Sequence, residues 1–413
     1  MKKTRAVIIG GGPAGMMAAI TAAKNGNEVI LLERMRTLGR KLSITGKGRC
    51  NLTNNIEIED FIKNIPGNGR FLYSAFHQFT NEDLITYFHS LGVETKAERG
   101  ERIFPVSDDA MQIVNTLKKE LEKHQVKVMV NTKVEKIIVE GNQIKAVKTE
   151  DSEIKCDKVI LATGGKSYPM TGSDGYGYKI VKELGHTIVE PKGSLVPMEI
   201  YESLDLQGLA LKNVSIRVFD NQKLVYEDFG EMLFTHFGIS GPIILSASSH
   251  ILRIKNLEEK LKKKEITILL DLKPALTEEK LAQRIQRDFE KYTKKQFKNA
   301  LNDLLPSKMI STAIELSQIH PEKQVDQINK KERENLVNAL KKFKITVKKF
   351  RPVEEAIVTA GGIHIKEINS TTMESKLVSG LYFAGEIIDV DAYTGGFNLQ
   401  IAFSTGYVAG LLQ

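Results

Sequence analysis

The feature that most constrains the fold is a glycine-rich turn between a predicted strand and a predicted helix near the start of the chain. Residues 7–9 form a short β-branched run, and Gly10-Gly11-Gly12-Pro13-Ala14-Gly15 connects it to an alanine-rich helical stretch. In such a turn the first glycine allows the tight bend, the second lets the backbone approach a pyrophosphate, and the third lets the helix pack on the strand. A second predicted strand, residues 28–32, ends at Glu33, whose carboxylate can accept hydrogen bonds from ribose hydroxyls. The sequence therefore predicts a dinucleotide site with the pyrophosphate at the helix N-terminus.

Two later strands favour FAD over NAD as the dinucleotide. Residues 158–165 end in Ala162-Thr163-Gly164-Gly165, and residues 380–386 end in Ala384-Gly385-Glu386. Both resemble fingerprints of flavoproteins with two dinucleotide-binding domains. The resemblance implies that the first lies near the AMP end of FAD and that Glu386 contacts the ribityl chain. Residues 395–398 then open a predicted C-terminal helix, whose N–H groups would face the electron-rich edge of a reduced flavin.

Three longer runs carry a narrower resemblance. They are residues 39–54 (GRKLSITGKGRCNLTN), residues 234–242 (FTHFGISGP) and residues 384–400, which join AGEIID to GGFNLQ. All three are similar to the aminoacetone-oxidase-like family of bacterial NAD(P)/FAD-dependent oxidoreductases, which also includes the bile-acid-pathway flavin reductases. The resemblance covers nearly the whole chain. It implies an FAD-dependent oxidoreductase but does not fix the substrate.

The predicted FAD site combines the glycine-rich turn with segments that the resemblance adds. Glycines in residues 39–54 allow close backbone approach, and the cationic side chains there would neutralise the pyrophosphate or an anionic reduced flavin. Cys50 lacks a Cys-x-x-Cys partner, which favours a small residue packed beside the flavin over redox catalysis. Val134, at the start of a predicted three-stranded meander, is expected to contact the adenine. The predicted cofactor contacts are Gly10, Gly12, Pro13, Ala14, Gly15, Glu33, Arg34, Arg40, Lys41, Gly46, Gly48, Arg49, Cys50, Asn51, Val134, Ala162, Thr163, Gly164, Gly385, Glu386, Gly396, Phe397, Asn398 and Leu399.

Two residues are candidates for catalysis. His236 lies just before a Gly-Ile-Ser-Gly-Pro run, which misses a hydrolase nucleophile elbow because Pro242 stands where glycine is required. His236 is a candidate general base for an amine or an α-carbon, but a buried histidine that fixes the loop is the favoured interpretation. Lys166 follows a predicted strand end and is a candidate for flavin contact or for stabilising charge during oxygen reduction. The other histidines lack metal-ligand spacing, so no metal site is predicted.

Cofactor fingerprints at both ends of the chain predict an α/β fold in which a Rossmann-like FAD-binding domain is split by an insertion. The FAD-binding domain takes residues 1–192 and 351–413, and the insertion takes residues 193–350. Alternating strands in the insertion predict a β-barrel-like subdomain. A lysine-rich helical excursion follows within it, at about residues 275–342.

Two local expectations concern the first part of the chain. Residues 107–124 are predicted to form a helix with Ser107 as its N-cap. Residues 154–161 are predicted to form one strand that follows the first two strands of the meander.

Composition and charge bound the environment and the partners. Two cysteines are too few for a disulfide framework, and a basic start that leads directly into a core strand leaves no room for a signal peptide, so a cytoplasmic protein is expected. No apolar run approaches the roughly 18 residues that a membrane span needs. The net charge of +8 comes largely from stretches that are typical of solvated helix faces, which disfavours nucleic acid as a partner. A small molecule is the expected substrate, and the sequence does not define the oligomeric state.

The reaction itself has two main interpretations and one from another class. The favoured one is oxidation of a small amine-type donor, with hydride transfer to flavin N5 and reoxidation by oxygen or another acceptor. The alternative is reduction of an activated C=C bond with NAD(P)H as a transient donor, although no second Gly-x-Gly-x-x-Gly motif provides a dedicated nicotinamide domain. A flavin-bearing RNA-binding or tRNA-modifying factor is the third interpretation, motivated by the charge.

Overall fold

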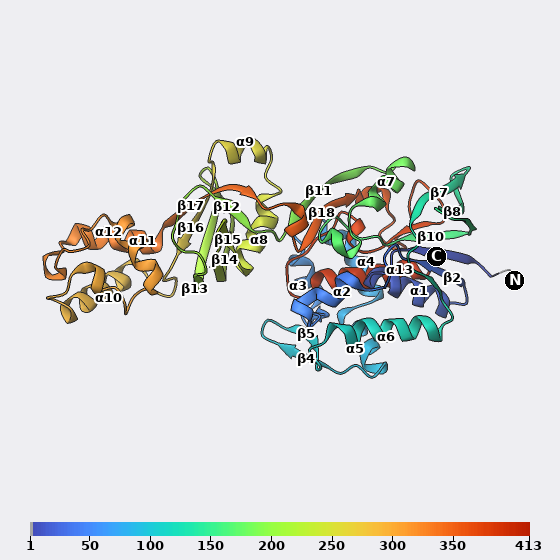
Figure 1. The fold of residues 1–413 in the computed structure, drawn as a ribbon, viewed down its shortest axis with the longest axis horizontal. Helices are drawn as coiled ribbons and strands as arrows, with labels where there is room; N and C mark the ends of the chain where they lie inside the picture. The colour runs from blue at the N-terminus through green and yellow to red at the C-terminus, as the bar shows by residue number, and fades with distance from the viewer. Residues whose placement is uncertain (1–2) are drawn as a thin grey trace. The chain divides into compact units, whose positions relative to one another are not determined.

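The computed structural model describes residues 3–413, which form two compact units (Figure 1). The first unit runs to Ser194 and resumes at Val353, and the second unit, called the insert below, comprises Leu195–Pro352. The two parts of the first unit share one hydrophobic core. The chain therefore has to return from the insert before the first unit is complete.

A parallel five-stranded sheet is the centre of the first unit. In order across the sheet, the strands are β19 (Leu381–Phe383), β10 (Lys158–Leu161), β1 (Arg5–Ile9), β2 (Glu28–Leu32) and β6 (Lys127–Met129). Four consecutive residues of β1 are buried, as expected for a parallel strand covered on both faces. The carboxyl ends of these strands meet at one edge, which is where open α/β sheets bind their ligands.

Helices α1 (Pro13–Lys24) and α13 (Phe397–Gly410) pack against each other although they lie at opposite ends of the chain (Figure 1). Glycines make the contact close. A Cβ atom at Gly406 would lie 2.4 Å from the Ala14 carbonyl oxygen, and one at Gly410 would lie 2.6 Å from that of Ala18. The C-terminal helix is thus held against the glycine-rich turn.

The other elements of the first unit surround this sheet. The strands are β3 (Thr53–Asn54), β4 (Thr95–Glu98), β5 (Arg102–Pro105), β7 (Val134–Glu140), β8 (Gln143–Thr149), β9 (Glu153–Lys155), β11 (Ile188–Ser194) and β18 (Val358–Ile363). The α-helices are α2 (Arg40–Ile44), α3 (Ile58–Lys63), α4 (Tyr73–Gln78), α5 (Asn81–Ser90), α6 (Ala110–Lys123) and α7 (Tyr176–Glu183). Strands β7, β8 and β9 form the antiparallel meander, and β11 pairs with β18.

Two local predictions are wrong. The N-cap of α6 is Asp109, whose carboxylate accepts from Met111 N at 2.8 Å, while the Ser107 hydroxyl donates to the Gln112 side chain. Residues 154–161 form two strands, because the Cys156 N–H donates to the meander and the next N–H, that of Asp157, donates to Arg5 O at the edge of β1. The segment predicted as one strand is therefore divided between two sheets.

The insert is a closed six-stranded barrel with helices attached. Around the barrel the strands are β12 (Met198–Ile200), β15 (Gly238–Ser240), β14 (Lys223–Phe234), β13 (Ala210–Asp220), β16 (Ile266–Asp271) and β17 (Phe343–Phe350). The helices are α8 (Pro242–Ile251), α9 (Leu257–Lys262), α10 (Glu278–Lys291), α11 (Ser307–Ser317) and α12 (Lys330–Lys341). The predicted fold class, a split Rossmann-like domain with a barrel-like insertion and a helical excursion, is confirmed. No helix within residues 3–413 is both long enough and apolar enough to span a membrane.

Candidate functional site

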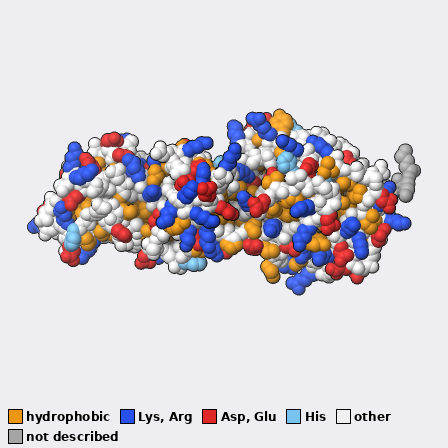
Figure 2. All heavy atoms as spheres, turned by 90° about the horizontal axis from the view of Figure 1, so that it is seen from above, with side chains coloured by type: hydrophobic (Ala, Val, Ile, Leu, Met, Phe, Trp, Pro, Cys, Tyr) orange, Lys and Arg blue, Asp and Glu red, His pale blue; other side chains and the backbone are white. Residues whose placement is uncertain are grey.

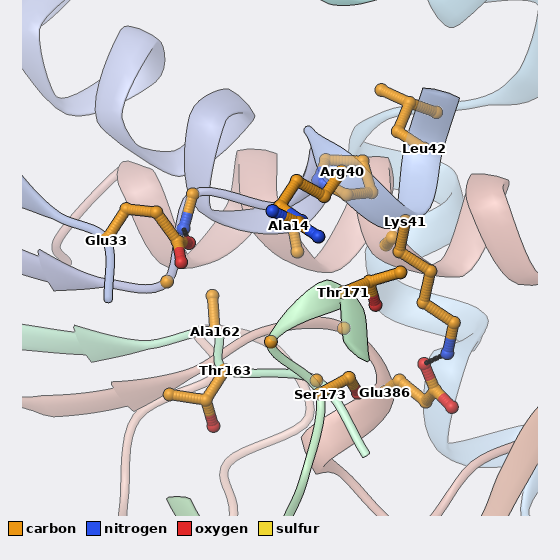
Figure 3. Close-up of a pocket in the computed structure, with 18 of the residues that line it drawn as sticks. Ala14, Glu33, Arg40, Lys41, Leu42, Ala162, Thr163, Thr171, Ser173 and Glu386 are labelled. Carbon is orange, nitrogen blue, oxygen red and sulfur yellow. Dashed lines mark hydrogen bonds and ion pairs between the residues drawn. The ribbon is translucent and has the colours of Figure 1, made fainter. Parts of the chain in front are cut away.

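A cavity of about 220 Å³ opens at the carboxyl edge of the parallel sheet in the first unit (Figure 3). Segments from the two ends of the chain and from its middle line it together. The predicted cofactor contacts among the lining residues are Gly10, Gly12, Pro13, Ala14, Glu33, Arg34, Arg40, Lys41, Val134, Ala162, Thr163, Gly164, Gly385, Glu386, Asn398 and Leu399.

The glycine-rich turn forms one wall of the cavity. Gly10 has a φ of +108°, and a Cβ atom there would lie 2.4 Å from Ala162 O, so only glycine fits between the two strands. Met16 N donates to Gly12 O, which leaves the N–H groups of Ala14 and Gly15 without an acceptor inside the helix. Donors in this position attract an anion.

Glu33 lies at one end of the cavity, at the carboxyl end of β2. One carboxylate oxygen accepts from Gly11 N at 2.7 Å and the other from Met35 N at 2.7 Å. Burial raises the pKa of Glu33, although these two hydrogen bonds oppose the shift. Because a carboxylate offers about four acceptor positions, Glu33 fixes the turn and still has lone pairs for a ligand.

Glu386 and Lys41 form an ion pair across the cavity from Glu33 (Figure 3). The Lys41 Nζ lies 2.7 Å from Glu386 Oε2 and also donates to Ser167 Oγ. Glu386 Oε1 accepts from Thr359 N at 2.8 Å and from the Ser167 hydroxyl. Burial opposes the charge on Glu386, but the Lys41 ammonium and the hydrogen bonds outweigh it, so the pKa of Glu386 is lowered.

Two buried hydroxyl groups in the cavity wall lack a partner. Among the described residues, neither Thr163 Oγ1 nor Ser173 Oγ forms a hydrogen bond. A Cβ atom at Gly12 would meet open space there, apart from its chain neighbours. Buried polar groups are normally paired, so two hydroxyls without a partner among residues that line the cavity favour a ligand with acceptor groups. Together with the free helix donors and the acid after β2, these residues fit an anionic dinucleotide.

Residues 167–174, called the strap below, contact the segment that follows β2 and opens α2. The Arg40 guanidinium donates to Met170 O at 2.9 Å, and Arg34 forms an ion pair of 2.6 Å with Asp174. The strap also supplies Thr171, Gly172, Ser173 and Asp174 to the cavity wall. None of the cofactor contacts predicted from the sequence lies in the strap. A signal was present in its small and turn-forming residues after a strand end.

Residues 46–51, together with Gly396 and Phe397 at the start of α13, do not line the cavity. The Asn51 amide oxygen accepts from Gly396 N, and Phe397 packs edge-to-face on Phe61 with ring centroids 4.6 Å apart. Burial raises the pKa of the Cys50 thiol to about 12, so it is neutral near pH 7. The predicted contacts outside the cavity lining are Gly15, Gly46, Gly48, Arg49, Cys50, Asn51, Gly396 and Phe397.

Two predicted cofactor contacts have other partners in the structure. The Arg49 guanidinium pairs with Glu98 and Asp108, which hold its charge away from the cavity. Asn398 lines the cavity, but its side-chain amide bonds Ala392 through both ends, accepting from N and donating to O. Its visible role is therefore to fix the loop before α13.

The two candidate catalytic residues do not line the cavity. The Lys166 side-chain stem packs beside Gly175, and its backbone N–H donates to Thr359 Oγ1. His236 belongs to the insert, in the loop between β14 and β15. The expectation that His236 is buried is wrong, because it is exposed and the loop is fixed by Thr235 Oγ1, which accepts from Gly238 N. Among residues 3–413 no group of three or more His, Cys, Asp or Glu side chains is arranged to hold a metal ion.

Comparison with known proteins matches the whole chain to one family. The pattern of the HI0933-like protein Rossmann domain covers residues 4–412. Over 406 residues the chain is 33% identical to the 3-dehydro-bile acid delta(4,6)-reductase of Clostridium scindens, spanning 98% of this chain and 97% of the relative. Over 408 residues it is 32% identical to the ribosomal RNA dihydrouridine synthase of Haemophilus influenzae, with coverage of 98% and 97%.

Solved structures share the fold at low sequence identity. A flavocytochrome c3 fumarate reductase in an open conformation has a TM-score of 0.52 and 16% identity, over 99% of this chain and 78% of that one. The 3-ketosteroid delta1-dehydrogenase of Sterolibacterium denitrificans has a TM-score of 0.53 and 12% identity, over 100% and 99%. These similarities show the fold alone.

Proposed function

Because the chain belongs to the HI0933-like Rossmann-domain family of FAD-dependent oxidoreductases, we propose that it reduces a C=C bond conjugated to a carbonyl group, with NAD(P)H as the electron donor. The observation that carries this proposal is the chemistry shared by the names of two full-length relatives. The delta(4,6) double bonds of a 3-dehydro bile acid are conjugated to the 3-oxo group, and dihydrouridine is uridine whose ring C=C bond has been saturated beside a carbonyl. Both names describe saturation of an electron-poor alkene.

In this proposal, different cavity residues bind different parts of FAD. The N–H groups of Gly12, Ala14 and Gly15 hold the pyrophosphate, and Glu33 accepts from the adenosine ribose. Glu386, held charged by Lys41, accepts from the ribityl hydroxyls at the other end. Bound FAD supplies hydride transfer between donor and acceptor.

The insert contributes no second dinucleotide-binding unit. It is a barrel with helices and contains no Rossmann unit within Leu195–Pro352 that would hold NAD(P)H. In this proposal the donor and the alkene react with the one flavin in turn, and ping-pong kinetics are expected.

Amine oxidation with reoxidation by oxygen, which the sequence analysis favoured, remains a prediction. Under anaerobic conditions the visible flavin band of the purified protein is followed after addition of NADH, NADPH or a panel of small amines. We expect a nicotinamide to bleach the band and a cyclic enone to restore it. Bleaching by an amine, together with an oxidised band that persists with both nicotinamides, would refute the reductase proposal.

A further inference from the structure

A buried hydrogen-bonded cluster joins the two parts of the first unit. Figure 2 shows many charged side chains at the surface, whereas the His186 side chain, between α7 and β11, is fully buried. Its Nδ1 atom lies 3.1 Å from Glu367 Oε2, and its Nε2 atom lies 2.9 Å from Ser375 Oγ. Glu367 and Ser375 belong to the part of the first unit that follows the insert. These three residues are called the imidazole cluster below.

The hydrogen bonds of Ser375 determine which ring nitrogen of His186 carries the proton. The Ser375 hydroxyl oxygen accepts from Leu377 N at 3.0 Å and from Val378 N at 2.9 Å. A hydroxyl group has two acceptor lone pairs and one donor hydrogen. Because both lone pairs are in use, the hydroxyl donates its hydrogen to His186 Nε2. The ring is therefore neutral, and its Nδ1–H group donates to Glu367.

The surroundings of this ring disfavour the imidazolium form. A second proton would be bound at Nε2 and would face the Ser375 hydroxyl, which has no lone pair left to accept it. Burial lowers the pKa of His186, although the Glu367 carboxylate opposes the shift. The Phe383 ring packs edge-to-face on the imidazole, with ring centroids 5.0 Å apart, and covers another side of it. The imidazolium form therefore requires the turn at Ser375 to open.

Glu367 is the one charged group that acts on the His186 ring among residues 3–413. Burial opposes the charge on Glu367, but hydrogen bonds from Thr187 and His186 outweigh it, so the pKa of Glu367 is lowered. Other titratable groups on the surrounding elements bond elsewhere or are exposed to solvent, and they are Lys182, Glu183, Glu190, His364, Lys366, Glu374, Lys376 and Tyr382.

The imidazole cluster fixes residues 364–378, called the return segment below. Glu367 Oε2 also accepts from Thr187 N at 2.9 Å, which ties the return segment to the start of β11. Ser375 N donates to the backbone of β19 at 2.7 Å. β19 leads directly to Glu386 in the wall of the cofactor cavity. The position of the cavity wall therefore depends on the return segment.

We infer that the imidazole cluster is a pH-sensitive switch, in which protonation of its histidine opens the return segment and weakens the binding of FAD. In the open form the ring is exposed to water, where a histidine titrates near pH 6.5. The closed form holds the ring neutral, so the open form binds one more proton below that pH. The closed form is then fully stable above about pH 7 and loses stability as the pH falls through about 6.5. Below that value the equilibrium constant for opening rises by up to about tenfold per pH unit.

The test measures amide hydrogen exchange of the full-length flavoprotein between pH 5 and pH 7, corrected for the intrinsic exchange rate. We expect the protection factor of a peptide that contains Leu377 and Val378 to fall by about 10- to 30-fold from pH 7 to pH 5. Glu367 and Glu386, whose pKa values are lowered, keep their charge over this range. A change in protection between these pH values therefore reports on the histidine.

His186→Gln removes the titrating ring and keeps a side chain that can donate to Glu367 and accept from Ser375. Its protection factor should be the same at pH 5 and pH 7. The matched control is His124→Gln on α6, because that ring also lies beside a carboxylate, with Nε2 3.5 Å from Glu120 Oε2. Within residues 3–413, no group forms a hydrogen bond with His124 Nε2. The control should keep the pH dependence of the parent.

Two further measurements use the parent protein alone. The rate of FAD release, followed by flavin fluorescence, should rise with the same pH dependence as the exchange. Nitrogen chemical shifts of 15N-labelled histidine distinguish the two neutral tautomers from the imidazolium, and we expect the Nδ1–H tautomer for His186 at pH 7. An Nε2–H tautomer or an imidazolium at pH 7 would overturn the inference. Exchange or FAD release that does not change with pH in the parent, or a pH dependence that persists in His186→Gln, would overturn it as well.

Discussion

Replacing Gly12 by alanine should separate cofactor binding from folding. Gly12 has φ −79° and ψ −176°, which alanine adopts without strain. Apart from its chain neighbours, no atom of the described residues lies within 4 Å of a Cβ atom built there. A glycine replaced at a compatible position changes the free energy of unfolding by less than about 1 kcal/mol. The apoprotein should therefore keep its stability.

The same methyl group stands where we place the pyrophosphate. It would hold the phosphate oxygens away from the N–H groups at the start of α1. Loss of one charge-assisted hydrogen bond removes about 1.5–3 kcal/mol. That loss corresponds to a rise of about 10- to 100-fold in the Kd for FAD.

Gly15→Ala is the matched comparison, three residues along the same turn. Its Cβ atom would lie 1.9 Å from Gly10 O, a backbone atom that cannot move without shifting β1 against α1. Overpacking of this kind costs about 1–3 kcal/mol of stability. Gly15→Ala should therefore lose both stability and FAD affinity, whereas Gly12→Ala should lose only affinity.

Urea unfolding of the apoproteins measures the first quantity, and quenching of flavin fluorescence on titration with apoprotein measures the second. A Gly12→Ala protein that binds FAD as tightly as the parent would show that the pyrophosphate does not lie against this turn. A Gly12→Ala apoprotein that is destabilised by more than about 1 kcal/mol would contradict the conclusion that a Cβ atom fits at Gly12 without strain.

Three further predictions concern the ion pairs and the exposed histidine. Lys41→Met should destabilise the protein by about 2 kcal/mol at pH 7, because Glu386 is left without its cation. The sign of its pH dependence should reverse. In the parent, the lowered pKa of Glu386 stabilises the fold at pH values above the ordinary pKa of a carboxyl group, and this contribution is lost as the pH falls. In Lys41→Met the pKa of Glu386 should be raised, so the free energy of unfolding should fall as the pH rises. Denaturant titrations from pH 4 to 8 measure this difference. Asp174→Asn removes the partly exposed ion pair to Arg34 and should raise the rate of FAD release by about 5-fold at low salt. Stopped-flow fluorescence measures this rate, and an unchanged rate would mean that the strap does not retain the cofactor. His236→Ala should change the unfolding free energy by less than about 0.5 kcal/mol, and a lower kcat with unchanged FAD content would identify it as a general base.

The family, the fold class and the assignment to FAD-dependent oxidoreductases were all predicted from sequence motifs, and all three predictions are confirmed. These properties depend on short-range features. The positive φ of Gly10 and the tight approach at Gly15 are steric requirements that only glycine meets, so they can be read without the rest of the molecule. The strand predicted at residues 28–32 lies at those residues, whereas the strand predicted at residues 154–161 is divided into two.

Which side chains contact one another depends on the folded chain as a whole. Lys41 and Glu386 are 345 residues apart in sequence and 2.7 Å apart in space, and no local pattern pairs them. Whether a charge serves the cofactor or the fold also depends on its distant neighbours, as Arg49 shows with Glu98 and Asp108. Long-range contacts of this kind depend on how the whole chain packs. The burial and the partners of each side chain then determine whether it stays charged. The glycine-rich turns that form the cofactor site could be predicted from local sequence. The ion pairs that set the charges of the site could not, because they join residues far apart in the chain.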